Sequence, residues 1–181
     1  MNVILDEVSR MLNQGSDRRY GGEAVSQLEH ALQCATLAEQ AGKTPELITA
    51  CLLHDIGHML RYLNEGKPQK GMDDKHEDLG AQYLSASFGP AVVEAVRLHV
   101  NAKRYLCLVD KDYWASLSPI SKYSLELQGG IFSEEEAAVF IEQPYAQDAV
   151  QLRIWDDQAK IQGLVTPDLH HFEKYLRESL R

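Results

Sequence analysis

The chain has 181 residues, of which 44% are hydrophobic and 25% charged, a size that suits one well-buried core better than two domains. Its 27 acidic and 18 basic residues give a formal net charge of −9, which argues against a surface for nucleic acid. No apolar run reaches the length of a membrane span. We therefore expect a single domain over residues 1–181, in the cytoplasm, with neither nucleic acid nor membrane as a partner.

Apolar residues recur at helical spacing along the chain, and the breaks between such segments are short and polar. After an amphipathic stretch at the N-terminus, a helix is predicted from Glu23 to a glycine stop at Gly42. The next is predicted to begin at Pro45, behind a capping threonine, and to run through Ile56. The polar residues 57–75 are predicted to form a surface loop. Further helices are predicted over residues 76–87, 90–101, 118–127, 133–142, 145–162 and 167–180, so the fold class should be all-α, a compact helical bundle.

Histidines and aspartates of the kind that bind metals are scattered over five stretches of this helical pattern. Imidazole and carboxylate together favour iron, manganese or zinc, whereas a structural zinc site would use thiolates. Cys34, Cys51 and Cys107 lie in apolar surroundings without CxxC spacing, which is typical of core residues in a reducing compartment. The remaining set suits two metal ions better than one: His30, His54, Asp55, His76, His99 and Asp156.

Two groups of these residues carry the argument for a buried site. The dipeptide His54-Asp55 ends a strongly apolar helix, where burial without partners would cost on the order of several kcal/mol, so a metal is favoured over an ordinary core histidine. Glu23, Gln27 and His30 share one helix face beside an apolar stripe. That face is either an exposed polar surface or a buried one whose partners are a metal and its substrate.

Cationic residues alternate with ligand-type residues in two of the predicted helices. His99 and Lys103 lie one turn apart, and Arg153, Asp156 and Lys160 repeat the alternation. This pattern indicates an anion-binding group of cations beside a metal. The alternative is a set of ordinary surface pairs, each worth only about 0.3–0.5 kcal/mol.

Periodicity leaves one ligand position open. Asp156 and Asp157 both have apolar neighbours at helical spacing, so either could face the core. His170 and His171, near the C-terminus beside charged residues, are expected to face solvent.

The order His30, His54-Asp55, Asp156 resembles that of the HD-domain superfamily, and the further His76 and His99 resemble its two-metal branch. Within that branch, the chain is similar to the PhnZ-like oxygenases of phosphonate catabolism over roughly residues 17–162. The HD dipeptide alone is a weak signal, whereas the ordered set is specific. The similar segments are Tyr20-Gly21-Gly22-Glu23, Gln27-Leu28-Glu29-His30, His99-Val100-Asn101-Ala102-Lys103-Arg104-Tyr105-Leu106, Leu127-Gln128-Gly129-Gly130 and Arg153-Ile154-Trp155-Asp156-Asp157.

The resemblance implies two iron ions in a mixed-valent Fe(II)/Fe(III) centre. Asp55 would bridge the two ions, and Asp156 rather than Asp157 would be a ligand. His58 would lie near the substrate, and Tyr20 with Glu23 would form a lid over the open iron position until substrate arrives. The ligand set that it implies is His30, His54, Asp55, His76, His99 and Asp156, and the substrate-binding set is Glu23, Gln27, Lys103, Ser121 and Arg153.

The activity implied by the resemblance is the dioxygen-dependent cleavage of the C–P bond of 2-amino-1-hydroxyethylphosphonate or an N-methylated analogue, giving phosphate and glycine or its N-methylated form. An HD-type phosphohydrolase, whose metals activate water against a phosphate ester, is the alternative. A binding module with a degenerate site is disfavoured because no ligand position is missing. From the sequence, Glu23 suits a primary ammonium, a trimethylammonium or no amine; Tyr62, Tyr83 and Tyr105 are candidates for cation–π contacts.

Overall fold

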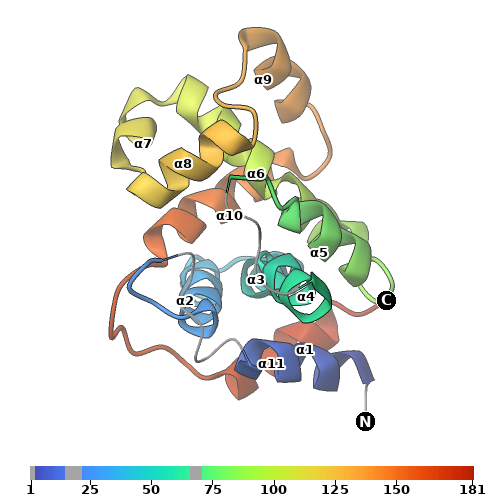
Figure 1. The fold of residues 1–181 in the computed structure, drawn as a ribbon. Coiled ribbons are helices and arrows are strands. Elements are labelled where there is room, and N and C mark those ends of the chain that lie inside the picture. Colours follow the sequence, from blue (N-terminus) through green and yellow to red (C-terminus); the bar gives the residue numbers. More distant parts are fainter. Residues whose placement is uncertain (1–2, 15–21, 66–70) are drawn as a thin grey trace.

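The computed structural model describes residues 3–14, 22–65 and 71–181, which form eleven helices and no strand (Figure 1). The predicted all-α class is therefore confirmed. Within these residues no helix is both long and apolar enough to cross a membrane. The helices are α1 (Val3–Gln14), α2 (Gln27–Gln40), α3 (Pro45–Leu53), α4 (Ile56–Glu65), α5 (His76–Leu84), α6 (Pro90–Val109), α7 (Lys111–Ser116), α8 (Pro119–Leu127), α9 (Glu134–Ile141), α10 (Ala146–Gln158) and α11 (Leu169–Glu178).

The largest difference from the sequence-based prediction lies between residues 57 and 75. The predicted loop is wrong for its first part, because α4 occupies residues 56–65. Its sequence is polar because the helix buries only one side: Ile56 and Met59 are buried, whereas Tyr62 and Leu63 are exposed. A further helix, α7, follows α6 where none was expected, and Asp110 caps it by accepting hydrogen bonds from two backbone amides.

Local signals explain where the other helices begin. α2 starts at Gln27 rather than at Glu23, because Ser26 and Glu29 form a reciprocal capping box. α3 starts as expected, with the Thr44 side chain accepting from the Leu47 amide. Two of the elements that carry candidate ligands, α2 and α3, are thus fixed at their N-termini by short-range contacts.

Helix α3 lies in the middle of the bundle and contacts α2, α6, α10 and α11 (Figure 1). The main hydrophobic core draws its residues from α1 to α6, α10 and α11. Two smaller clusters join α9 and α7–α8, the upper part of Figure 1, to α6 and α10. The site is built where the main core meets this upper part, along α6 and α10.

Helices α4 and α5 approach each other closely at Gly57. A Cβ atom added to Gly57 would lie 1.9 Å from the backbone oxygen of His76, so any other residue would force the two helices apart. On the α5 side, a Cβ at Gly80 would lie 3.3 Å from the Gly57 nitrogen. Because His76 is the first residue of α5, the contact positions its imidazole relative to Asp55.

Candidate metal centre and substrate pocket

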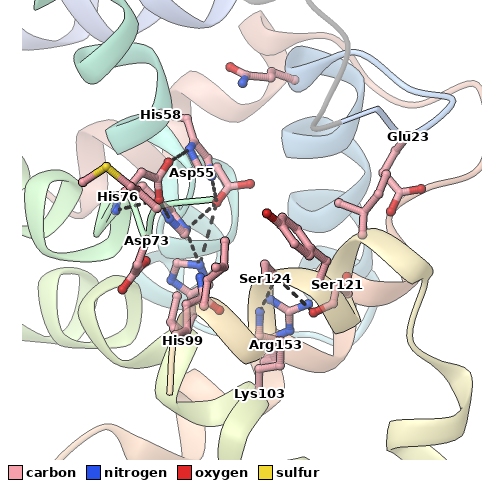
Figure 2. Close-up of a pocket in the computed structure, with 18 of the residues that line it drawn as sticks. Glu23, Asp55, His58, Asp73, His76, His99, Lys103, Ser121, Ser124 and Arg153 are labelled. Atoms are coloured by element: carbon pink, nitrogen blue, oxygen red, sulfur yellow. Dashed lines mark hydrogen bonds and ion pairs between the residues drawn. The ribbon is translucent and has the colours of Figure 1, made fainter. Parts of the chain in front are cut away.

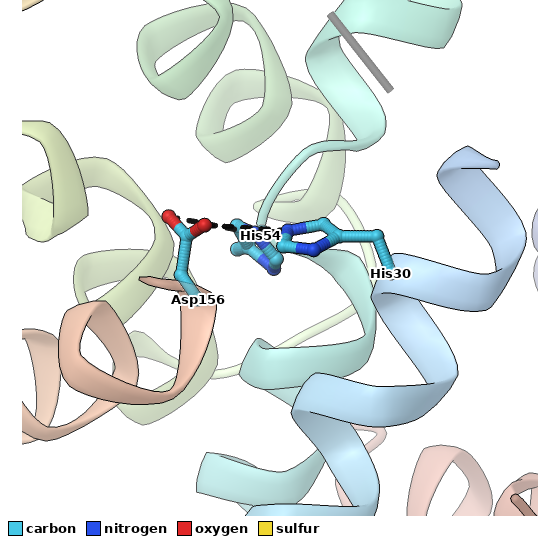
Figure 3. Close-up of side chains that lie close together, drawn as sticks. All are labelled: His30, His54 and Asp156. Carbon is cyan, nitrogen blue, oxygen red and sulfur yellow. Dashed lines mark hydrogen bonds and ion pairs between the residues drawn. The ribbon is translucent and has the colours of Figure 1, made fainter. Parts of the chain in front are cut away.

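The candidate ligands form two neighbouring groups of three. The inner trio consists of His30 from α2, His54 at the end of α3 and Asp156 from α10 (Figure 3). Its Nε2 atoms, of His30 and His54, lie 3.1 Å apart, and His30 Nε2 lies 3.3 Å from Asp156 Oδ1. These three residues are at most 1% exposed. Side chains of this polarity are buried at this depth only when they share partners.

The pocket-side trio consists of Asp55, His76 and His99 (Figure 2). The Nε2 atom of His76 lies 3.2 Å from His99 Nε2 and 3.3 Å from Asp55 Oδ1. The other oxygen of Asp55 faces the inner trio, 3.4 Å from His54 Nε2 and 3.7 Å from His30 Nε2. Asp55 therefore lies between the two trios and reaches both with its carboxylate.

The second ring nitrogen of each histidine shows how the imidazoles are oriented. The Nδ1 atoms of His30, His54 and His99 lie 2.8, 2.8 and 2.6 Å from backbone carbonyl oxygens, and Nδ1 of His76 lies 2.9 Å from Asp74 Oδ1. Because an oxygen acceptor requires a donor, these contacts assign the ring hydrogen to Nδ1. Each Nε2 then presents a lone pair to the shared space, as metal-binding histidines do.

These donors fit a pair of metal ions. Two imidazole lone pairs facing each other at about 3 Å repel unless a cation or a proton lies between them. In addition, Asp55 Oδ2 is buried and accepts no hydrogen bond from the residues that the structure describes. Nitrogen and carboxylate oxygen donors without thiolate are those preferred by iron, manganese and zinc.

Electrostatics inside the site favour a positive charge. Burial alone would lower the pKa of His54, but the adjacent Asp55 carboxylate raises it to about 10. Burial would likewise lower the pKa of His76, whereas hydrogen bonds to Asp55 and Asp74 raise it to about 10. Burial would raise the pKa of Asp55, but His54 holds it well below its usual range. The carboxylates thus stabilise protons on the rings, and a metal ion has to displace those protons to bind.

A pocket of about 560 Å³ opens onto the pocket-side trio and not onto the inner one. Figure 2 shows the histidines gathered beside Asp55, with Lys103 and Arg153 close by and Glu23 further out. The predicted site residues at this pocket are the pocket-side trio and the described substrate-binding and catalytic residues, whereas the inner trio lies behind it and Tyr20 lies outside the described residues. The predicted substrate-binding and catalytic residues that line it are Glu23, Gln27, His58, Lys103, Ser121 and Arg153.

Two buried cations lie beside the trios. Lys103 is 2% exposed and donates to Ser124 Oγ at 2.7 Å; burial lowers its pKa to about 7, with Arg153 adding to the effect. Arg153 Nη1 lies 2.7 Å from Asp156 Oδ2, and its other nitrogens donate to both oxygens of Asp157. Asp156 therefore lies between the histidines and Arg153, while Asp157 pairs with Arg153. Of the two aspartates that periodicity left open, Asp156 is the one that lies beside the candidate ligands.

Glu23 lies at the outer side of the pocket and already has partners. The Ser118 hydroxyl donates to Glu23 Oε1 at 2.7 Å, and Lys160 Nζ lies 3.5 Å from the same oxygen. Lys160 also donates to Ser121 Oγ at 3.0 Å. A cation of the protein thus already pairs with the carboxylate that the resemblance places at the substrate.

Several residues of the site were not found from the sequence. Asp74 contacts both His58 and His76, and only its position two residues before His76 could have indicated this. Ser124 and Tyr123, on α8, line the pocket, and no distinctive spacing marks them. Gln128, next to α8, also lines it; it lies in one of the segments similar to the family, but no role was predicted for it.

The remaining predictions concern three tyrosines and two histidines near the C-terminus. Of the three tyrosines considered for cation–π contacts, only Tyr62 lines the pocket, because Tyr83 donates to Glu7 and Tyr105 packs against Phe140. The side chain of His170 is 87% exposed, as predicted. The prediction is wrong for His171, which is half-buried and lies 2.8 Å from a carboxylate oxygen of Glu39.

The fold and the paired trios define a helical metalloprotein of the His–Asp type. The HD-domain family model matches residues 28–137, more than half of the chain. The chain is 47% identical over 172 residues to "Hydroxymethylphosphonate dioxygenase" of Gimesia maris, covering 93% of this chain and 85% of the relative. It is 38% identical over 169 residues to "[1-hydroxy-2-(trimethylamino)ethyl]phosphonate dioxygenase (glycine-betaine-forming)" of Leisingera caerulea, covering 93% and 86%. The chain belongs to the HD-domain family, in the PhnZ-like branch.

A third relative carries no activity in its name. The chain is 32% identical over 187 residues to "Uncharacterized protein L432" of Acanthamoeba polyphaga mimivirus, covering 99% of this chain and 84% of the relative. The similarity to all three therefore extends over most of each chain.

Proposed function

We propose that this chain is a di-iron oxygenase that uses dioxygen to cleave the C–P bond of a 1-hydroxyphosphonate, releasing phosphate and a carboxylate. The observation that carries the proposal is the meeting, in one pocket, of the pocket-side trio with the buried cations Lys103 and Arg153. The names of two relatives, both phosphonate dioxygenases, support it.

The iron ions would be held by the two trios, with Asp55 shared between them. Because one trio is sealed and the other opens to the pocket, the two ions would have unlike surroundings, which suits a mixed-valent Fe(II)/Fe(III) pair. When bound, iron supplies the electron transfer to dioxygen that protein side chains cannot provide. The six ligands of this proposal are His30, His54, Asp55, His76, His99 and Asp156.

The side chains of the pocket bind and orient the substrate. Lys103 would neutralise charge on the phosphonate, and Arg153, whose own charge is balanced by Asp156 and Asp157, would contribute an N–H donor. The Ser121 hydroxyl would donate to a phosphonate oxygen. His58, whose Nε2 lies 3.8 Å from Asp55 Oδ1, lies where it can contact the substrate beside the pocket-side trio. The resemblance assigns Glu23 and Tyr20, of which Tyr20 lies outside the described residues, to a lid that would exclude water until the substrate is bound.

The substituent of the substrate determines the carboxylate product. A 2-amino-1-hydroxyethyl substrate, as the resemblance implies, would give glycine, and its N-methylated analogues the N-methylated forms. Hydroxymethylphosphonate would give formate: one dioxygen takes up the four electrons lost by the carbon, and its two oxygen atoms are distributed between formate and phosphate. The ion pair of Glu23 with Lys160 favours the substrate without a cationic group in this chain.

Phosphate release from enzyme supplied with Fe(II) tests the proposal, with hydroxymethylphosphonate, 2-amino-1-hydroxyethylphosphonate and its trimethylated form as substrates. We expect release under air and none without dioxygen. Continued release under anaerobic conditions would instead support the phosphohydrolase alternative.

Lys160→Met tests the preference within the same panel. Removing the competing cation should raise kcat/KM for the primary amine relative to hydroxymethylphosphonate by about tenfold, as expected for a like-charge contact near the surface. Lys174→Met is the matched control, because it also removes a lysine that pairs with a glutamate. Lys174 Nζ lies 3.4 Å from Oε1 of Glu39, near the C-terminal end of α2. An equal loss for all three substrates would instead make Lys160 a ligand of the phosphonate.

A further inference from the structure

One carboxylate outside the two trios, Asp74, contacts two histidines of the site at once. Its Oδ2 atom lies 2.6 Å from His58 Nδ1, and its Oδ1 atom lies 2.9 Å from His76 Nδ1. The two rings are stacked, with centroids 3.8 Å apart and planes 15° apart. Asp74 therefore contacts two parallel imidazoles with one carboxylate. His76 is a proposed metal ligand, and His58 is proposed to lie beside the substrate.

The segment that carries Asp74 is itself held in place. Arg61, from α4, donates to the Asp74 backbone oxygen at 2.6 Å. The next residue, Lys75, has a φ of 46°, an uncommon conformation for a residue other than glycine, and His76 then begins α5. The carboxylate thus has a fixed position relative to both α4 and α5.

The contacts determine which nitrogen of each ring faces the pocket. A carboxylate accepts only, so Nδ1 of both rings donates to Asp74. The Nε2 lone pair of His76 is then directed at Asp55 and His99, and Nε2 of His58 is directed at Asp55 from the other side. A carboxylate behind a metal-binding imidazole also makes that ring a stronger donor.

Asp74 differs in this respect from the partners of the other three histidines. His30, His54 and His99 direct Nδ1 to backbone oxygens, which no substitution removes. At Nδ1 of His76 the partners are carboxylates: Asp74 Oδ1 at 2.9 Å and, further away, Glu77 Oε2 at 3.5 Å. The orientation of His76 in the pocket-side trio therefore depends on side chains, of which Asp74 is the nearer.

We propose that Asp74 is a positioning residue that fixes the imidazoles of His58 and His76 for the pocket-side metal and its substrate. The inference rests on the proposed function, since it assumes that the pocket-side trio binds a metal. In this proposal Asp74 acts by orienting the two histidines, and it does not itself contact the reacting atoms.

Anaerobic Fe(II) titration of the metal-free chain, followed by metal analysis, tests the inference for Asp74→Asn, which keeps the size of the side chain. We expect wild-type protein to bind two Fe(II) ions, and the variant to bind one normally and the other about 10- to 100-fold more weakly. The melting temperature of the metal-free variant should stay within a few degrees of wild type. Excess Fe(II) should restore part of the kcat, and Asp74→Glu should restore more.

Asp78→Asn is the matched control, because Asp78 lies on α5, is exposed and undergoes the same change in charge. It should bind both ions like wild type. Normal binding of two ions by Asp74→Asn, or weaker binding of both ions together with a large fall in melting temperature, would overturn the inference. If wild-type protein bound no second ion, the proposed function would fail instead.

Discussion

The inner trio and the pocket-side trio use the same kinds of side chain in different surroundings. His30, His54 and Asp156 are sealed in the core, whereas Asp55, His76 and His99 line the pocket. The inner trio is held by backbone oxygens and by Arg153, and the pocket-side trio depends in part on Asp74. Under the proposed function, the inner trio would hold one metal within the core, and the pocket-side trio would hold the metal that meets substrate and dioxygen.

Removal of one histidine from each trio gives the largest expected effect. His76→Ala and His30→Ala should each lose one iron and all detectable phosphate release, because both positions are needed for turnover. They should differ in stability: His30→Ala also removes the buried contact to the Ala159 oxygen, at a cost of about 1–3 kcal/mol in the free energy of unfolding. Metal analysis and thermal unfolding check both. Full activity of His76→Ala would contradict the two-metal assignment.

Removal of Arg153 should affect both the stability of the core around the inner trio and the binding of substrate in the pocket. The sequence alone suggests that Arg153→Ala mainly weakens substrate binding, but Arg153 is buried against Asp156 and Asp157. Leaving those carboxylates without their cation should lower the free energy of unfolding by about 3–5 kcal/mol. Lys103→Ala is the contrast: it should weaken phosphonate binding about 10- to 100-fold with a smaller change in stability. Calorimetric titration and denaturant unfolding separate the two effects, and equal stability of the two variants would contradict this account.

Gly57→Ala should disturb the pocket-side trio selectively. The added methyl group would overlap the His76 backbone oxygen, so α5 must shift, at a cost of about 1–3 kcal/mol in stability. Gly80→Ala, whose nearest contact would be 3.3 Å, should cost less. Iron analysis should find the inner ion retained and the pocket-side ion bound weakly in Gly57→Ala. Retention of both ions with wild-type affinity would show that the close approach does not position His76.

The smallest expected effect is one of pH. Burial lowers the pKa of Lys103 to about 7, so its ammonium is present below that pH and is lost as the pH rises above it. Affinity for a phosphonate dianion should therefore fall above pH 7, by no more than the loss expected for Lys103→Ala. In Lys103→Arg the cation persists at all these pH values, so the dependence that remains belongs to the ligand and the other groups. Identical profiles of the two proteins would exclude Lys103 as the titrating group.

Much of this arrangement follows from local sequence, and the rest depends on tertiary contacts. The helical class, the caps at Thr44 and the breaks at proline could be predicted, because they depend on neighbouring residues. Helix α4 was missed because only one of its sides is apolar, in a segment rich in glycine and charge. Neither Asp74 nor the Lys160 to Glu23 ion pair could be predicted, since each joins residues whose proximity only the folded chain determines.

The dipeptide His54-Asp55 has a consequence for how the centre responds to strain. Its two members are adjacent in the chain, yet one belongs to the inner trio and the other to the pocket-side trio. The described chain has no cis peptide bond, so the two Cα atoms are held about 3.8 Å apart by covalent geometry. Under the proposed function, the two metals would therefore take one ligand each from neighbouring residues whose Cα separation is set by covalent geometry, whereas their other ligands are held relative to one another by helix packing.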